Sequence, residues 1–313
     1  MIKSKKQVSF LVIACIFTIT LLFLSSCNKE PVEPVEWQTN YEQAIIQAKT
    51  DNKPIFAIFT GLSWDAKSAT LKAEIFDTDN FKNEIAKSFV PLMIDIDANN
   101  ESIPFEIAQK NYNLAVKIGL TETPAIILFT QNGIPFTQLD FGEFSITSES
   151  ILSLLSSRKD IISKFTKLEN AIEGTEGMAR VKAIDAFYEA LPDEYHLIMG
   201  DVIREIPDLD PQNESGLLGK YLLMLTYADA QSCIEDQDSD GALQCFINLL
   251  EKKDMFTTEE NQELLYSTAV LAAKIGKSND VVLDYLQQAY DADTKTENAS
   301  YILEKIKQLK GNN

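Results

Sequence analysis

Histidine and cysteine are scarce in this chain of 313 residues, which contains one histidine and four cysteines. The histidine, His196, lies in the segment LPDEYHLIMG, with no cysteine or second histidine near it in the sequence. Zinc sites and histidine-dependent catalysis need several such side chains together. We therefore expect His196 to be a helix residue without a catalytic role, and we predict no cofactor.

Basic residues are also few. Lys and Arg number 28 against 47 Asp and Glu, which gives a net charge of −19 at pH 7. Phosphate contacts require clustered Lys and Arg, so the charge argues against a nucleic-acid partner. The same charge disfavours adhesion of the folded part to an anionic membrane surface. A hydrophobic content of 45% is enough for two ordinary domains in a chain of this length.

An apolar run near the N-terminus, residues 10–23, follows three lysines and leads to the segment LSSC. The run is shorter than the roughly 20 residues that a transmembrane helix needs. This order resembles a bacterial lipobox, in which the cysteine, here Cys27, receives lipid. The resemblance implies a lipoprotein signal peptide over 1–26 and a lipid-anchored protein of the bacterial cell envelope. By resemblance to Gram-negative lipoprotein sorting, Asn28 after the cysteine implies the outer membrane, facing the periplasm. An ordinary signal peptide and an uncleaved anchor remain as alternatives.

Residues 27–36 contain two prolines and three glutamates and predict an extended tether. From residue 37 to residue 160, apolar runs suited to buried strands alternate with helical patterns. The expected strands are 54–59, 89–97, 125–129 and 135–142, and the expected helices are 41–48, 65–76, 77–88, 105–118 and one from 147. Asn132–Gly133 predicts a hairpin between the last two strands. The pattern predicts an α/β domain with a mixed central sheet covered by helices on both faces.

Residues 161–313 contain helical patterns and no strand-like run. The clearest apolar stripes lie at 217–230, 242–250, 264–273 and 281–290. The segment 257–260 supplies a capping box and Gly276 a helix C-terminal stop. The second helices of the two pairs begin about 40 residues apart. This spacing predicts an all-α, helical-repeat-like domain similar to tetratricopeptide repeats, with an irregular helical bundle as the alternative.

Several motifs of the first domain occur in the order typical of one family. They are FTG-x2-W at 59–64, EIFDT at 74–78, TETPAIILF at 121–129 and the Asn-Gly turn. Together they resemble the thioredoxin superfamily, and in particular envelope members that carry a Cys-x2-Cys pair after the tryptophan. The resemblance covers residues 37–158. It implies a thioredoxin-like fold, a cis bond before Pro124, and a groove in which the backbone of Thr123 pairs with an extended substrate.

The redox residues of that family are replaced in this chain. By the resemblance, Asp65 occupies the position of the nucleophilic cysteine and Ser68 that of the resolving cysteine. Thiol–disulfide exchange requires a thiolate sulfur, so neither replacement supports it. The strand position of the family's buried carboxylate falls on Ile58, with a shift of one residue left open. Asp65 remains suited to cap a helix, which is worth about 1 kcal/mol. We therefore predict no catalytic residue and a binding groove formed by Trp64, Asp65, Ser68, Thr123 and Pro124.

Two cysteines remain once Cys15, in the signal peptide, and Cys27 are set aside. Cys233 and Cys245 flank the turn of the first helix pair, where a structural disulfide and two unpaired thiols are both open. A redox-active pair is disfavoured, because the acidic turn between them would raise a thiol pKa.

That turn, DQDSDG at 236–241, places Asp236, Asp238 and Asp240 at the first positions of a calcium loop. Ile247 stands where the loop needs a bidentate glutamate. We favour a tight turn with a helix N-cap, keep a weak calcium site as the alternative, and predict no metal.

These observations lead to one functional hypothesis and two alternatives. The leading hypothesis is a membrane-anchored, redox-inactive thioredoxin-like lipoprotein that binds a protein or peptide. The first alternative is a thiol–disulfide oxidoreductase or isomerase that uses Cys233 and Cys245. The second is a structural spacer in the envelope.

Overall fold

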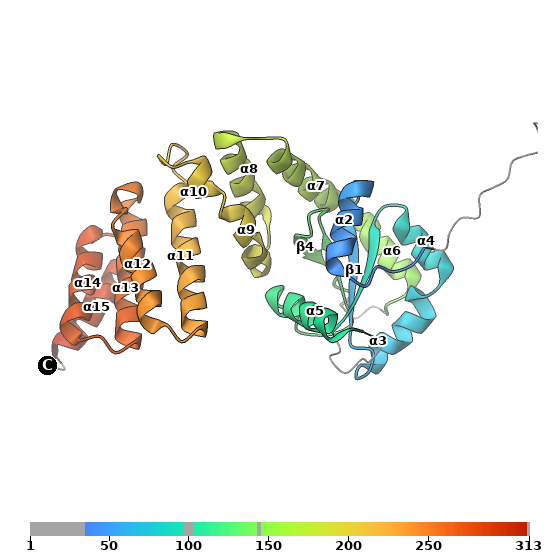
Figure 1. Ribbon diagram of the computed structural model, residues 1–313, viewed down its shortest axis with the longest axis horizontal. Helices are drawn as coiled ribbons and strands as arrows, with labels where there is room; N and C mark the ends of the chain where they lie inside the picture. Colours follow the sequence, from blue (N-terminus) through green and yellow to red (C-terminus); the bar gives the residue numbers. More distant parts are fainter. Residues whose placement is uncertain (1–34, 97–102, 143–144, 312–313) are drawn as a thin grey trace, which may run out of the picture. The chain divides into compact units, whose positions relative to one another are not determined.

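The computed structural model describes residues 35–96, 103–142 and 145–311 (Figure 1). The predicted signal peptide and Cys27 lie outside these residues. From Trp37 onward the chain forms one compact unit. Within the described ranges, no helix is both long and apolar enough to cross a membrane.

The central sheet has four strands in the order β2-β1-β3-β4. β1 (Ile55–Thr60) pairs in parallel with β2 (Val90–Asp95) and antiparallel with β3 (Ala125–Phe129). β4 (Pro135–Gln138) returns antiparallel to β3, as the Asn-Gly turn predicts. Every residue of the first three strands is buried, which explains their continuous apolar sequence. The predicted mixed sheet is confirmed, although β4 ends four residues earlier than its apolar run suggests.

Helices form two groups around this sheet (Figure 1). α2 (Tyr41–Asp51) and α5 (Phe105–Lys117) are joined by an ion pair, with Lys110 Nζ 2.7 Å from Glu42 Oε1. α4 (Asp79–Ala86) and α6 (Ser148–Ser157) line a common cavity. Between β1 and α4, the helix that begins at residue 66 runs as α3 (Ala66–Leu71) and continues as a π-helical turn (Lys72–Phe76).

The apolar core of the sheet does not break at residue 160. α7 (Lys159–Glu173) and α8 (Gly177–Ala190) follow α6, and both contribute to it. Phe136 of β4 stacks on Phe165 of α7 with ring centroids 4.9 Å apart, and Phe165 meets Phe187 of α8 at 5.4 Å. The same core continues through short helices at Asp193–Met199, α9 (Gly200–Ile203) and α10 (Ile206–Leu209), and ends at Tyr221.

A second core belongs to the C-terminal helices. They are α11 (Leu218–Glu235), α12 (Ser239–Leu250), a 3-10 turn (Lys253–Met255), α13 (Thr258–Lys274), α14 (Asn279–Ala292) and α15 (Glu297–Gly311). The core runs from Leu223 to Ile306. The capping box at Thr257 and Glu260 is confirmed, and Gly276 has the positive φ of +77° that a helix stop requires. The all-helical C-terminal region is therefore as predicted.

Candidate functional site

The loop after β1 folds into a tight turn that places Asp65 at the start of α3. The amides of Trp64 and Asp65 both donate to the carbonyl of Gly61, at 3.1 and 2.7 Å. Asp65 has extended backbone angles, and its carboxylate accepts from the amides of Lys67 and Ser68 at 3.0 and 3.1 Å. These are the hydrogen bonds of an N-cap, so the predicted cap is confirmed.

The Asp65 carboxylate also receives two hydroxyl groups. Ser68 Oγ and Thr123 Oγ1 both donate to Asp65 Oδ2, the latter at 3.1 Å. Partial burial acts to raise the pKa of Asp65, but the hydrogen bonds from Ser68, Lys67 and Thr123 outweigh it and hold that pKa below its ordinary value. Asp65 is therefore ionised at neutral pH and does not serve as a proton donor there.

This network joins three of the predicted groove residues, Asp65, Ser68 and Thr123. The Thr123–Pro124 bond is cis, and both residues are half-buried beside α3. Ser68 is fully buried, and its Oγ accepts from the amide of Gly61 at 3.3 Å. Trp64 instead leaves 59% of its surface exposed. A Cβ on Gly61 would lie 2.2 Å from the Trp64 ring, so the indole covers the glycine backbone closely.

A buried carboxylate lies next to this loop that the sequence did not single out. Ile58 is a buried apolar residue of β1, as its sequence implies. Asp95, at the end of β2, pairs in register with Thr60 and is only 5% exposed. Its Oδ1 accepts from the amide of Leu62 at 3.0 Å. The available signal was the acidic ending of the second strand, FVPLMIDID, because parallel neighbours end at the same edge of a sheet.

The two remaining cysteines are free thiols and touch each other. Cys233 lies near the end of α11 and Cys245 in α12, and both are half-buried. Burial raises the pKa of Cys245, and the neighbouring Cys233 raises it further. At neutral pH this lowers the thiolate fraction on which redox chemistry depends.

The acidic turn between the cysteines is arranged as a helix start. Asp238 caps α12 and accepts from the amide of Gly241 at 2.8 Å. Asp240 pairs with Lys277 of the next helix pair at 2.6 Å. Across the residues that the structure describes, no group of three or more acidic, His or Cys side chains is placed to hold a metal ion. The geometry thus favours the turn over the calcium loop.

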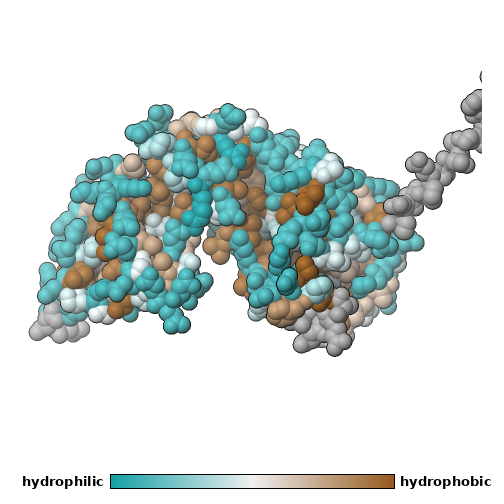
Figure 2. Space-filling view, in the orientation of Figure 1, coloured by the Kyte–Doolittle hydropathy of each residue, from teal (hydrophilic) through white to brown (hydrophobic). Residues whose placement is uncertain are grey.

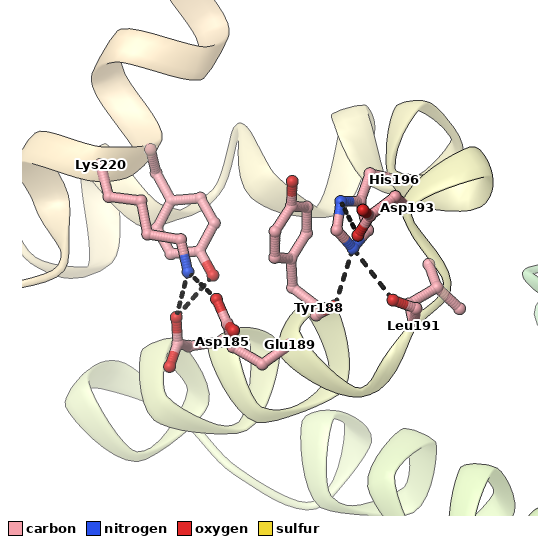
Figure 3. Close-up of polar contacts among 8 residues, drawn as sticks. Asp185, Tyr188, Glu189, Leu191, Asp193, His196 and Lys220 are labelled. Atoms are coloured by element: carbon pink, nitrogen blue, oxygen red, sulfur yellow. Dashed lines mark hydrogen bonds and ion pairs between the residues drawn. The ribbon is translucent and has the colours of Figure 1, made fainter. Parts of the chain in front are cut away.

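His196 has a structural role at the end of α8 (Figure 3). Its ring stacks on Tyr188 with centroids 3.9 Å apart, and Nε2 lies 3.1 Å from the carbonyl oxygens of Tyr188 and Leu191. Since both partners are acceptors, Nε2 carries the proton. The histidine lies in a 3-10 helix and ties the following segment to α8.

Comparison with known proteins agrees with this geometry. A family model described as a thioredoxin-like domain matches residues 41–145. Residues 41–145 form a thioredoxin-like domain. A second family model, described as an uncharacterised protein C-terminal domain, matches residues 217–313.

Two proteins of Chlamydia pneumoniae are similar to part of the chain. The thioredoxin-related protein DsbJ is 22% identical over 127 residues, which are 41% of this chain and 36% of DsbJ. The disulfide bond reductase DsbH is 25% identical over 107 residues, 34% of this chain and 63% of DsbH. The chain therefore spans less than two thirds of either relative. A solved structure of a DsbH oxidoreductase aligns with 22% identity over 42% of this chain and 91% of that one, with a TM-score of 0.34.

Proposed function

We propose that the protein is a redox-inactive, thioredoxin-like lipoprotein of the bacterial cell envelope that binds an extended protein segment. In this proposal lipid on Cys27 holds it to the outer membrane, facing the periplasm. The observation that carries the proposal is Asp65, which stands at the helix start where the family places its nucleophilic cysteine.

The arrangement around Asp65 supports redox inactivity. Exchange with a disulfide passes through a mixed disulfide, and a carboxylate cannot form one. Two amides and two hydroxyls already point at the Asp65 carboxylate, so it acts as a structural tie. The first alternative is an oxidoreductase or isomerase that uses Cys233 and Cys245. It is disfavoured because the raised pKa of Cys245 lowers the fraction of reactive thiolate.

The surface beside Asp65 supports binding. Trp64 exposes most of a large aromatic side chain, and such residues commonly anchor protein contacts. The loop at Thr123 lies beside Asp65, and an extended segment would pair with the backbone of that loop. Among proteins similar to this one, DsbH is named a disulfide bond reductase; we infer that this chain kept the recognition surface without the chemistry.

Redox inactivity is tested by insulin reduction with dithiothreitol as electron donor. We expect the wild-type protein to match its Cys233→Ala/Cys245→Ala variant at the background rate. A second variant, Asp65→Cys/Ser68→Cys, restores a thiol pair and is expected to exceed that rate. If wild type reduces insulin faster than the alanine variant, the protein is an oxidoreductase and the proposal is wrong.

Binding is tested on an array of immobilised, cysteine-free 15-residue peptides. Trp64→Ala is expected to abolish most of the signals that wild type gives. Ile46→Ala on α2 is the matched control, since Ile46 exposes a similar fraction, 57%, and is not part of the groove. If Trp64→Ala and Ile46→Ala reduce the signals equally, or if wild type gives no signals, the proposed binding function is wrong. The structural-spacer alternative then stands.

Lipid attachment is tested by metabolic labelling with radioactive palmitate in a bacterial host. Cys27→Ser should remove the label, whereas Cys15→Ser, within the predicted signal peptide, should keep it. Label that survives Cys27→Ser would contradict the predicted anchor.

A further inference from the structure

A broad depression lies on one face of the C-terminal helices. Two adjoining cavities, of about 560 and 340 Å³, flank a ridge formed by Tyr266, Val270 and Lys274 of α13. Residues one turn apart on a helix share a face, which explains why these three stand in a row. One cavity opens between α13 and α15, and the other between α11 and α13. We call this surface the α13 groove.

The α13 groove is unusually apolar for exposed surface. Tyr227 on α11, Val270 on α13 and Tyr301 on α15 expose 42%, 38% and 49% of their area. Ile234, two turns after Tyr227, exposes 44%. Brown apolar residues break the mostly teal surface over these C-terminal helices (Figure 2). Contiguous apolar surface of this kind, in contrast to single exposed residues, marks interaction sites.

Two ammonium groups line the apolar surface without a carboxylate partner. Lys274 and Lys305 both border the larger cavity, and neither forms an ion pair with any residue that the structure describes. Lys305 Nζ instead lies 5.0 Å from the ring centre of Tyr301. These two lysines therefore present positive charge to whatever enters the groove.

We propose that the α13 groove binds a short acidic and apolar segment of another protein. Carboxylates of the segment pair with Lys274 and Lys305, and its apolar side chains pack on Val270 between the tyrosines. Neighbouring helices pack about 8–10 Å apart, so three helices span roughly 20 Å, or about six residues of extended chain. This site is separate from the binding surface proposed beside Asp65 and Trp64, and its test is independent of the function proposed there.

Charge complementarity selects this occupant. A basic segment would lose the two ion pairs and face two like charges. A purely apolar segment would cover both ammonium groups without offering them an acceptor, which disfavours it.

The probe is a fluorescein-labelled pool of hexapeptides that alternate Phe or Leu with Asp or Glu, measured by fluorescence anisotropy on the full mature chain. The comparison pool carries Lys at every acidic position. We expect wild type to bind the acidic pool at least tenfold more tightly than the basic pool. Lys274→Glu/Lys305→Glu should reverse that preference, and Val270→Ser should weaken both.

The matched control is Lys252→Glu/Lys253→Glu, which changes the net charge equally at two exposed positions outside the groove. It should keep the wild-type preference, with folding of every variant checked by circular dichroism. Equal binding of the two pools, no binding of either, or the same loss in control and groove variants overturns the proposal. Sedimentation that shows a dimer abolished by Val270→Ser would also overturn it, because the groove would then be occupied by a second copy of the chain.

Discussion

At the scale of single residues, Asp65 joins two segments that are far apart in the sequence. Its carboxylate caps α3 through the amides of Lys67 and Ser68 and also accepts the hydroxyl of Thr123, next to the cis peptide. A cysteine thiol is a weak acceptor and would not collect these three donors together with the Ser68 hydroxyl. If Asp65 replaces a nucleophilic cysteine, as proposed, the replacement adds a structural tie at the position where it removes the thiol.

Asp65→Ala should lower the free energy of unfolding by about 1–2 kcal/mol at pH 7, because the helix loses its cap. The pKa of Asp65 is lowered from an ordinary value of 3.8, so its stabilisation is present above pH 3.8 and is lost as pH falls further. The difference between wild type and variant should therefore shrink below pH 3.8. Urea unfolding followed by tryptophan fluorescence measures it, since Trp37 and Trp64 are the only two tryptophans.

The control for this prediction is Glu74→Ala, which removes an exposed carboxylate in the π-helical turn after α3. It should change the free energy of unfolding by less than about 0.5 kcal/mol both at pH 7 and at about pH 3. A wild-type advantage over Asp65→Ala that persists unchanged at pH 3 would contradict the lowered pKa.

Sequence reasoning at this scale succeeded where a residue acts through its local neighbours. The cap at Asp65 follows from a short polar residue before a helical pattern, and the cis bond at Pro124 follows from a motif. Asp95 was missed because its partners, Thr60 and Leu62, are defined by strand pairing and lie more than 30 positions away.

At the scale of elements, α7 stabilises the β3–β4 hairpin through one buried glutamate. Glu169 is 3% exposed, and its two oxygens accept from the amides of Gln131 and Asn132 at 3.2 and 3.1 Å. Burial raises the pKa of Glu169, although the hydrogen bonds from Thr130 and the turn oppose that shift. The turn therefore depends on a helix that comes about 40 residues later in the chain.

Glu169→Ala should cost about 2–3 kcal/mol, because two partly buried amides lose their acceptor, and Glu169→Gln should cost less. A group with a raised pKa stabilises below its ordinary value, here 4.5, and that contribution is lost as pH rises through the folded value. The advantage of wild type over Glu169→Gln should thus decline from pH 4.5 to pH 7.5, opposite in sign to Asp65. Urea titrations at these two pH values provide the measurement, and an advantage that grows with pH would refute it.

The same glutamate shows why α7 was not predicted as an element. Its buried face carries Phe165, Glu169 and Ile172, so a charged residue interrupts the apolar stripe. α8 buries Val181, Ile184, Phe187 and Tyr188, which lie at i, i+3, i+6 and i+7 on one helix face, so the sequence held a signal for this helix. In α15 the buried residues Ala299, Ile302 and Ile306 also follow helical spacing, so that pattern was an available signal. The strands were predicted well because burial on both faces makes their sequences continuously apolar.

At the scale of the whole molecule, α11 links two apolar cores. Tyr221 belongs to the first core and Leu223 to the second, only two positions later. Near Tyr221, Asp185 of α8 accepts from the Tyr221 hydroxyl at 2.7 Å and pairs with Lys220 at 3.0 Å (Figure 3). The division predicted at residue 160 rests on where strand-like sequence ends. Continuity of the first core past that point raises the question of which residues unfold together.

A pair of variants, Phe187→Ala and Leu286→Ala, tests which residues unfold together. Both remove a large buried side chain, with 0% and 4% of its area exposed, and each should cost about 2–5 kcal/mol in its own core. Because Trp37 packs against the first core and Trp64 lies in the loop after β1, tryptophan fluorescence reports on the first core alone. Phe187→Ala should lower the urea midpoint seen by fluorescence, although Phe187 lies beyond residue 160. Leu286→Ala should leave that midpoint in place and lower the one seen by circular dichroism of the helices. If Phe187→Ala leaves the fluorescence midpoint unchanged, the cooperative unit ends near residue 160 and the aromatic contacts from β4 to α8 do not couple the two parts.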